Sequence, residues 1–318
     1  MKNKLQTHLF SLIVITLMLF SITPHGVVAQ NTSADFKEDL ISSMGTKSDS
    51  VLPGNSTGIT LTEKAKDYRI NKVVPAFGIH VIPSPYGFSK WPDVSKPEVS
   101  ELITNFSGYQ IHSGDFLGSD LDTFYALDDG SKTLLTISTA DGSIETIATL
   151  TPPAGILSGL TAAEGFFYGI ATNCLIQTTL YKLNLTGEIE VLGDIPNALC
   201  VVDLAYIPSE KMIYMVDVSH DALFKIDPAN PAGAVKVGDG LGFNANYAQG
   251  MDYDEVNGIL YWAACSPDLT AELRIINTET GGSEKIGDFE SSEVTAFGIA
   301  PGYINMQHHI HFPMINRH

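Results

Sequence analysis

Short apolar runs separated by turn residues recur along most of this chain at an interval of about 45 residues. Four of these runs centre on a tyrosine: Phe-Tyr-Ala-Leu, Phe-Tyr-Gly-Ile, Ile-Tyr-Met-Val and Leu-Tyr-Trp-Ala. The tyrosines are Tyr125, Tyr168, Tyr214 and Tyr261, separated by 43, 46 and 47 residues. A fixed period of this size is typical of repeat architectures such as solenoids and propellers.

Each unit contains four runs with strand character. One apolar run precedes the tyrosine run, a third follows it, and a fourth comes after a turn rich in Gly, Asp and Thr. The runs are short, and the chain beyond residue 30 shows no helical periodicity. Four strands in a 45-residue unit predict the blade of a β-propeller. The first run of each unit is anchored at Phe116, Leu160, Leu204 or Met251. The third run begins at Leu134, Leu180, Leu223 or Leu273. The fourth run centres on Ile147, Leu192, Val237 or Ile286.

The two ends of the array carry complementary parts of one further unit. A fifth first strand is predicted at 295–299, where Phe297 follows Met251 by 46 residues. A fifth last strand is predicted at 101–104, and the segments 77–81 and 86–88 can supply the middle two strands. An open β-solenoid, or a sandwich of repeated hairpins, is the alternative, but an open stack needs polar caps at its ends. We therefore expect an all-β propeller of five four-stranded blades, in which N-terminal strands complete the last blade.

The residues before and after the repeats are expected to have other roles. Lys2 and Lys4 precede an apolar stretch, and small residues end it at Ala29, which is typical of a cleaved secretory signal peptide. The apolar stretch is short for a membrane anchor. We predict a signal peptide at 1–29, a flexible leader at 30–69, the propeller at 70–300 and a tail at 301–318, with no membrane span after cleavage.

Net charge restricts the partners. The formal charge is −18, and loss of the signal peptide with its two lysines brings it to −20. Such a surface repels the phosphates of nucleic acids and anionic lipids, so we expect no nucleic-acid partner.

The chain has three cysteines, Cys174, Cys200 and Cys265. In an exported protein one bridge and one remaining thiol are the simplest arrangement. We predict a disulfide between Cys174 and Cys200, which are 26 residues apart, and a partly buried thiol at Cys265; two buried thiols at the first pair are the alternative. No Cys-x-x-Cys pair suits zinc.

Two groups of acidic residues are candidate calcium sites. Asp252, Asp254 and Asn257 begin like a calcium loop, but the third ligand comes one position late and no glutamate ends the loop. A turn between strands is the preferred interpretation. The second group is an acidic cluster at the start of the first full repeat, for which a solvated face is preferred; it comprises Asp115, Asp120, Asp122, Asp128 and Asp129. No other cofactor is expected.

Histidines offer two further candidates. His220 lies between Asp217 and Asp221, and a histidine between carboxylates can serve as a general base. No Gly-x-Ser-x-Gly motif accompanies it, so a salt bridge within the loop is preferred. The tail residues His308, His309, His311 and His318 can bind a metal ion, although a disordered end is the preferred interpretation.

Several stretches resemble secreted bacterial propeller modules found beside subtilisin-like serine proteases and in multidomain surface proteins. The resemblance covers roughly residues 75–300 and is carried mainly by 241–254, which contains the unusual Asn-Tyr-Ala-Gln sequence. It is also carried by Thr172-Asn173-Cys174, by Asp203-Leu204-Ala205 after Cys200, and by Leu273 to Ile276 with Thr280-Gly281. The resemblance implies an accessory or adhesion-type module, and the catalytic motifs of subtilisin-like proteases are absent from this chain.

The sequence thus favours a secreted, non-catalytic binding or scaffolding propeller whose extracellular ligand is a protein or a carbohydrate. No catalytic residue is assigned. The alternatives are a hydrolase or lyase with a site in the propeller funnel, and the accessory region of a secreted protease that lacks its catalytic domain.

Overall fold

The computed structural model describes residues 70, 72–82, 86–247, 249–290 and 293–301. The chain divides into two units, Met1–Asp67 and Tyr68–His318, and the described residues belong to the second. The predicted signal peptide, the leader and, apart from Pro301, the tail with its four histidines lie outside them.

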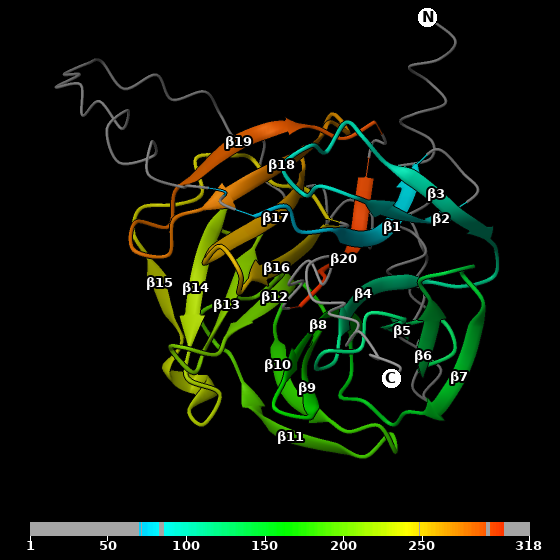
Figure 1. The fold of residues 1–318 in the computed structure, drawn as a ribbon. Coiled ribbons are helices and arrows are strands. Elements are labelled where there is room, and N and C mark those ends of the chain that lie inside the picture. The colour runs from blue at the N-terminus through cyan, green and yellow to red at the C-terminus, as the bar shows by residue number, and fades with distance from the viewer. Residues whose placement is uncertain (1–69, 71, 83–85, 248, 291–292, 302–318) are drawn as a thin grey trace, which may run out of the picture. The chain divides into compact units, whose positions relative to one another are not determined.

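The described residues form a five-bladed β-propeller of four-stranded antiparallel sheets, as the sequence predicted (Figure 1). In four blades the strands follow one another in chain order from the centre of the ring outward. The innermost strands are β4 (Ile111–Phe116), β8 (Ile156–Ala163), β12 (Val201–Ile207), β16 (Gly250–Asp254) and β20 (Glu293–Ile299). The second strands are β1 (Ala76–Ile82), β5 (Thr123–Asp128), β9 (Phe166–Thr172), β13 (Met212–Asp217) and β17 (Ile259–Cys265). The third strands are β2 (Tyr86–Trp91), β6 (Thr133–Ser138), β10 (Thr178–Leu183), β14 (Ala222–Ile226) and β18 (Ala271–Ile276). The outer strands are β3 (Glu101–Phe106), β7 (Ile144–Thr149), β11 (Ile189–Asp194), β15 (Val235–Val237) and β19 (Ser283–Asp288).

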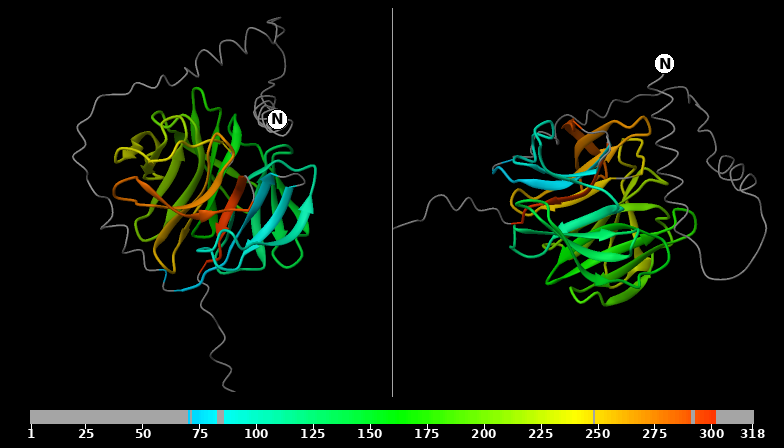
Figure 2. Two further views of the ribbon diagram at one scale, coloured as in Figure 1. Left: turned by 90° about the horizontal axis from the view of Figure 1, so that it is seen from above. Right: turned by 90° about the vertical axis from the view of Figure 1, so that its right-hand side faces the viewer.

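The remaining blade closes the ring. Strand β20 pairs antiparallel with β1, so that Ala76 lies opposite Ile299 and Phe77 opposite Gly298. In Figure 2 the red strand β20 lies beside the blue-to-cyan strands of the same sheet. This pairing joins the two ends of the propeller unit and satisfies a sheet edge that would otherwise be exposed.

Apolar side chains fill the spaces between neighbouring sheets. The five buried clusters of the described residues each combine side chains from two adjacent blades. The tyrosine runs supply much of this packing because a second strand is covered on both faces; in β17 all seven residues are buried. The outer strands are covered on fewer sides, and Leu102, Val191 and Val235 are exposed on them.

Glycine in the turn between third and outer strands allows neighbouring blades to approach closely. Gly187 and Gly281 both have positive φ angles, of 84° and 72°. A Cβ atom on Gly187 would lie 2.6 Å from Cβ of Ala148, and one on Gly281 would lie 2.0 Å from the carbonyl oxygen of Val237. These turns correspond to the repeated Thr-Gly elements of the sequence. One blade differs, because a 3-10 helix, η2 (Pro231–Gly233), follows its third strand and contacts β11 of the preceding blade.

Within the described part of the chain, no helix has the length and apolar character needed to cross a membrane.

Candidate functional site

A cavity of about 260 Å³ lies at the centre of the ring, where the innermost strands end. All five blades contribute to it, since its walls come from the ends of β4, β8, β12, β16 and β20 and from the residues that follow them. We call it the central cavity. It is lined by Asp115, Phe116, Gly118, Thr161, Ala162, Ala163, Glu164, Tyr206, Pro208, Asp252, Tyr253, Glu255, Ile299, Ala300 and Pro301.

Asp115 is one of two buried carboxyl groups in the wall of the central cavity. Its side chain is 6% exposed. One oxygen accepts a hydrogen bond from the backbone N–H of Phe116 at 2.6 Å, and the other accepts one from Ala162 in the next blade at 2.6 Å. Burial raises the pKa of Asp115 to about 7, and the charge of Glu255 acts in the same direction.

Asp252 repeats this arrangement at another junction. Its oxygens accept hydrogen bonds from Tyr253 N at 2.7 Å and from Ile299 N of the closing strand at 2.6 Å. Burial raises the pKa of Asp252 well above its ordinary value, and Asp115 and Asp203 contribute to the same shift. The side chains of Asp115 and Asp252 are therefore buried hydrogen-bond acceptors that each link two blades.

Three further side chains link the remaining pairs of blades. Asp203 accepts hydrogen bonds from Leu204 N at 2.8 Å and from Met251 N of the next blade at 2.7 Å. Thr161 accepts one from Tyr206 N at 3.0 Å. At the last junction Thr295 Oγ1 donates to the carbonyl oxygen of Ile111 at 3.1 Å. One innermost strand is thus bonded to the next by a side chain at each of the five junctions.

The outer part of the central cavity is acidic and aromatic. Glu164 and Glu255 are exposed, and the rings of Tyr206 and Tyr253 are half-buried. Burial and the charge of Glu164 raise the pKa of Tyr206. Burial, followed by the charges of nearby carboxylates that include Glu255, raises the pKa of Tyr253. The phenol rings therefore lie in a negative electrostatic field.

The acidic cluster expected as one solvated face is divided by the structure. Asp115 lies at the end of β4, and Asp120 and Asp122 are exposed in the following loop. Asp128 is the last residue of β5 and Asp129 follows it, and both are buried. The interpretation as a solvated face is wrong for Asp115, Asp128 and Asp129, because their carboxylates accept backbone hydrogen bonds from Ala162, Gln110 and Leu157. The positions of these aspartates along the sequence do not show at which end of a strand each of them lies.

The segment that begins like a calcium loop forms a turn between β16 and β17. Asp254 accepts hydrogen bonds from the backbone N–H groups of Val256 at 2.8 Å and Asn257 at 3.1 Å. Asp252, by contrast, is directed toward Ile299. Among the described residues no group of three or more His, Cys, Asp or Glu side chains is arranged to hold a metal ion.

His220 and Asp217 form the ion pair expected for this loop. The structure adds Ser219, whose hydroxyl lies 3.0 Å from His220 Nδ1 and 2.8 Å from both carboxylate oxygens of Asp217. In a serine–histidine–aspartate relay the acid and the serine contact opposite ring nitrogens. Here both contact Nδ1. The carboxylate of Asp221 accepts a hydrogen bond from Ala245 N at 3.0 Å.

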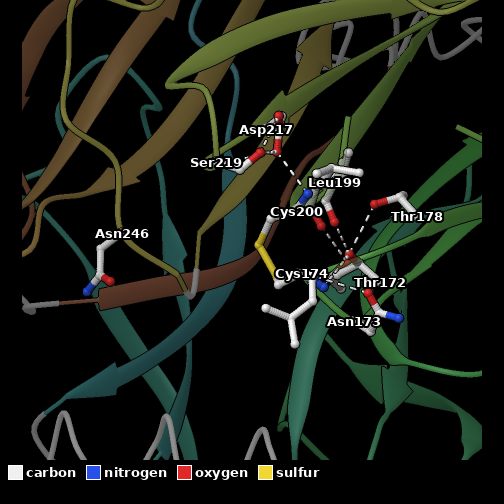
Figure 3. Close-up of a disulfide and its surroundings, with 12 residues drawn as sticks. Thr172, Asn173, Cys174, Thr178, Leu199, Cys200, Asp217, Ser219 and Asn246 are labelled. Atoms are coloured by element: carbon white, nitrogen blue, oxygen red, sulfur yellow. Dashed lines mark hydrogen bonds between the residues drawn. A yellow bond between two sulfur atoms is a disulfide. The ribbon is translucent and has the colours of Figure 1, made fainter. Parts of the chain in front are cut away.

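A disulfide joins Cys174 to Cys200 and so connects the blades that contain β9 and β12 (Figure 3). Thr172 Oγ1 lies beside the bridge, donating to the carbonyl oxygen of Leu199 at 2.9 Å, and Asp217 accepts a hydrogen bond from Cys200 N at 2.9 Å. These contacts fix the backbone on both sides of the bridge. The disulfide lies at the opposite ends of the innermost strands from the central cavity, because Cys200 precedes β12.

A buried thiol and a buried carboxyl group meet near the start of β20. Cys265 is fully buried outside the disulfide, and its Sγ lies 3.9 Å from Oε1 of Glu293. Burial raises the pKa of Cys265 and raises that of Glu293 to about 7. A thiol in this state is protonated at neutral pH and is a poor nucleophile. Glu293 was not predicted as a candidate residue, because no repeat position marks it.

The fold and the central cavity define the chain as a five-bladed β-propeller with a concave site at its axis. No protein-family model and no curated protein sequence matches the chain. Its similarity to solved structures lies in the fold, at low sequence identity. A chain of a nidogen/laminin complex matches at 9% identity with a TM-score of 0.47, covering 72% of this chain and 98% of that chain.

Two other solved structures show a similar level of similarity. TolB from Acinetobacter baumannii is 13% identical with a TM-score of 0.43, over 72% of this chain and 67% of that chain. An oligogalacturonate lyase in complex with manganese is 15% identical with a TM-score of 0.39; the match covers 68% of this chain and 62% of the lyase. The comparisons give no family.

Proposed function

We propose that this chain is a secreted, non-catalytic binding propeller and that an extracellular protein or carbohydrate binds in the central cavity. The observation that supports this most directly is that Asp115 and Asp252 line the cavity and also link neighbouring blades. Both line the cavity, and both carboxyl groups are held by backbone N–H groups of two adjacent blades. Groups held in this way are rigid and so shape and polarise a binding site.

The walls of the central cavity suit recognition. Tyr206 and Tyr253 are half-buried in the cavity wall and offer large rigid surfaces. They lie on innermost strands, which are fixed by the hydrogen bonds at the blade junctions. A rigid aromatic site reduces the entropy that binding must overcome.

Binding to panels of soluble glycans and synthetic peptides tests the proposal. We expect at least one class to bind the purified chain, and we expect the double variant Tyr206→Ala/Tyr253→Ala to bind at least about tenfold more weakly, as for loss of aromatic anchor residues. Tyr109→Ala is the matched control, because Tyr109 is half-buried and does not line the cavity. Turnover of a panel member, or unchanged binding by the double variant, would count against the proposal.

Export and the accessory role are part of the same proposal. They are supported by the signal-peptide pattern that ends at Ala29 and by the resemblance of 75–300 to modules beside secreted proteases. N-terminal sequencing of protein recovered from the culture medium should begin at Gln30. Retention of the intact N-terminus inside the cell would contradict it.

A further inference from the structure

We propose that the ligand group held in the central cavity is an organic cation, the ammonium of a lysine side chain or the guanidinium of an arginine side chain. This inference rests on the proposed function and specifies the chemistry of its ligand. The wall of the central cavity includes four acidic residues, Asp115, Asp252, Glu164 and Glu255. It includes no Lys, Arg or His among its described residues.

The two buried carboxyl groups of the wall have acceptor capacity left. Asp115 and Asp252 are 6% and 7% exposed, and each of their oxygens accepts one backbone hydrogen bond. The Thr161 side chain adds a third hydrogen bond to Asp115. A carboxylate oxygen has two lone pairs, so part of the acceptor capacity of both groups remains unused. A donor that also carries positive charge stabilises a buried carboxylate most, because it offsets the cost of burying the anion.

The aromatic rings make the cavity suited to an organic cation in particular. Tyr206 and Tyr253 line the same volume as the carboxyl groups. The face of a tyrosine ring attracts ammonium and guanidinium groups within about 6 Å of its centre. Glu164 and Glu255 stand at the exposed part of the wall, where they would attract a cation from solvent.

The propeller already contains this arrangement within its own chain. Lys225 Nζ lies 3.0 Å from a carboxylate oxygen of Glu210 and 5.4 Å from the centre of the Tyr214 ring. The Tyr214 hydroxyl donates to the same oxygen of Glu210 at 2.8 Å. A tyrosine, a glutamate and an alkylammonium group therefore form a stable set in this protein, and the central cavity provides the first two without the third.

The size and chemistry of the cavity disfavour other ligands. A volume of about 260 Å³ is below the range of about 300–1,000 Å³ typical of drug-sized ligands, and it suits the end of one side chain. The exposed carboxylates of Glu164 and Glu255 repel anions. Calcium prefers six to eight oxygen ligands, and among the described residues no group of three or more acidic, His or Cys side chains is arranged to hold a metal ion.

Calorimetry with small probes tests the inference on the full chain. The cationic probes are Nα-acetyl-lysinamide and Nα-acetyl-argininamide, and the uncharged partners of similar shape are Nα-acetyl-norleucinamide and Nα-acetyl-citrullinamide. We expect each cationic probe to bind at least about tenfold more tightly than its uncharged partner. A short lysine- and arginine-containing peptide distinguishes a protein partner, which should bind more tightly than the single residues, from a free amino acid.

Variants locate the binding. Glu164→Gln/Glu255→Gln should weaken the cationic probes several-fold and reduce the salt dependence of binding, while Tyr206→Leu should weaken them at any salt concentration. Glu145→Gln, on the exposed face of β7, is the control and should change nothing. Equal binding of the uncharged probes, or displacement of the cationic probes by micromolar calcium, would overturn the inference.

The two proposals fail in different ways. If a glycan binds and Tyr206→Ala/Tyr253→Ala removes that binding while cationic probes do not bind, the proposed function stands and the cation site is wrong. If no glycan, peptide or probe binds, both are wrong.

Discussion

Asp115, Asp203 and Asp252 are acidic residues in the interior of the propeller, where charge is costly. Each accepts one hydrogen bond from the residue that follows it and one from the next blade. Burial raises the pKa of all three. Their retention therefore reflects the backbone N–H groups that they satisfy, because a buried N–H without an acceptor costs more than the bond itself contributes.

Replacement of Asp203 should reveal this role. Asp203→Ala leaves the N–H groups of Leu204 and Met251 without their acceptor, and we expect the free energy of unfolding to fall by about 2–4 kcal/mol. Denaturant unfolding of the two proteins measures the difference. Asp239→Ala, at an exposed position, should change stability by less than about 0.5 kcal/mol. Equal effects of the two substitutions would contradict the structural role of Asp203.

The disulfide gives a second prediction for single residues. Cys174→Ala/Cys200→Ala opens a link that spans 26 residues, and the free energy of unfolding should fall by roughly 3 kcal/mol. A thiol reagent should find one thiol per chain in the unfolded, unreduced protein and none in the native protein, since Cys265 is buried. Three thiols in the unreduced, unfolded chain would show that the bridge is not formed.

At the scale of the strand and the blade, the sequence carried most of the information. The spacing of Tyr125, Tyr168, Tyr214 and Tyr261 marked the second strands, because only a strand buried on both faces repeats so apolar a pattern. The complementary ends of the array predicted that β20 pairs with β1. The 3-10 helix η2 was not predicted, since it replaces a turn of similar length in one repeat.

The central cavity could not be predicted in the same way. Its residues come from five segments spread between Asp115 and Pro301, and no local pattern shows that these segments meet. The aspartates were visible in the sequence but were interpreted as solvated or as turn residues. Asp115 and Asp252 are buried because the backbone of the next blade donates a hydrogen bond to each of them. The donor residue is 47 positions further along the chain in both cases.

The turn glycines allow a test at the scale of the blade junction. Gly281 and Gly165 have similar φ angles, of 72° and 80°, but only Gly281 approaches a neighbouring blade. Gly165→Ala should therefore cost about 1–2 kcal/mol for the left-handed conformation alone. Gly281→Ala should cost at least about 1 kcal/mol more, because its Cβ atom would lie 2.0 Å from the carbonyl oxygen of Val237.

Thermal and denaturant unfolding of the two glycine variants give the comparison. Equal losses would show that neighbouring blades move apart without cost at this turn. A larger loss for Gly165→Ala would contradict the close approach of the outer strands.

At the scale of the whole molecule, the ring combines two kinds of interaction that repeat at every junction. Apolar clusters fill the space between adjacent sheets, and at least one side-chain hydrogen bond joins each pair of innermost strands. The apolar clusters supply most of the burial, whereas the hydrogen bonds fix how far one blade is turned relative to the next. The geometry of the central cavity depends on these hydrogen bonds, because Asp115, Thr161 and Asp252 both line the cavity and bond to the next blade.

This use of buried acids makes the stability of the propeller depend on pH. Burial raises the pKa of Asp115 and of Glu293 to about 7. The same groups in an unfolded chain titrate near pH 4, as is usual for carboxyl groups. Between about pH 4 and pH 7 the folded protein therefore holds protons that the unfolded chain has released, and the free energy of unfolding falls as the pH rises through this range.

Glu293→Gln isolates one of these groups. Glu293 is 4% exposed, and Gln has the same shape without a charge. The variant should match the parent protein at pH 5 within about 1 kcal/mol and exceed its free energy of unfolding by on the order of 3 kcal/mol at pH 8, because only the parent must ionise a buried carboxyl group. Urea unfolding at the two pH values measures both differences. The exposed control Glu145→Gln should shift stability equally at pH 5 and pH 8. If the Glu293→Gln protein is less stable than the parent at pH 8, a partner stabilises the carboxylate of Glu293. The contribution of Glu293 to the free energy of unfolding would then rise with pH instead of falling.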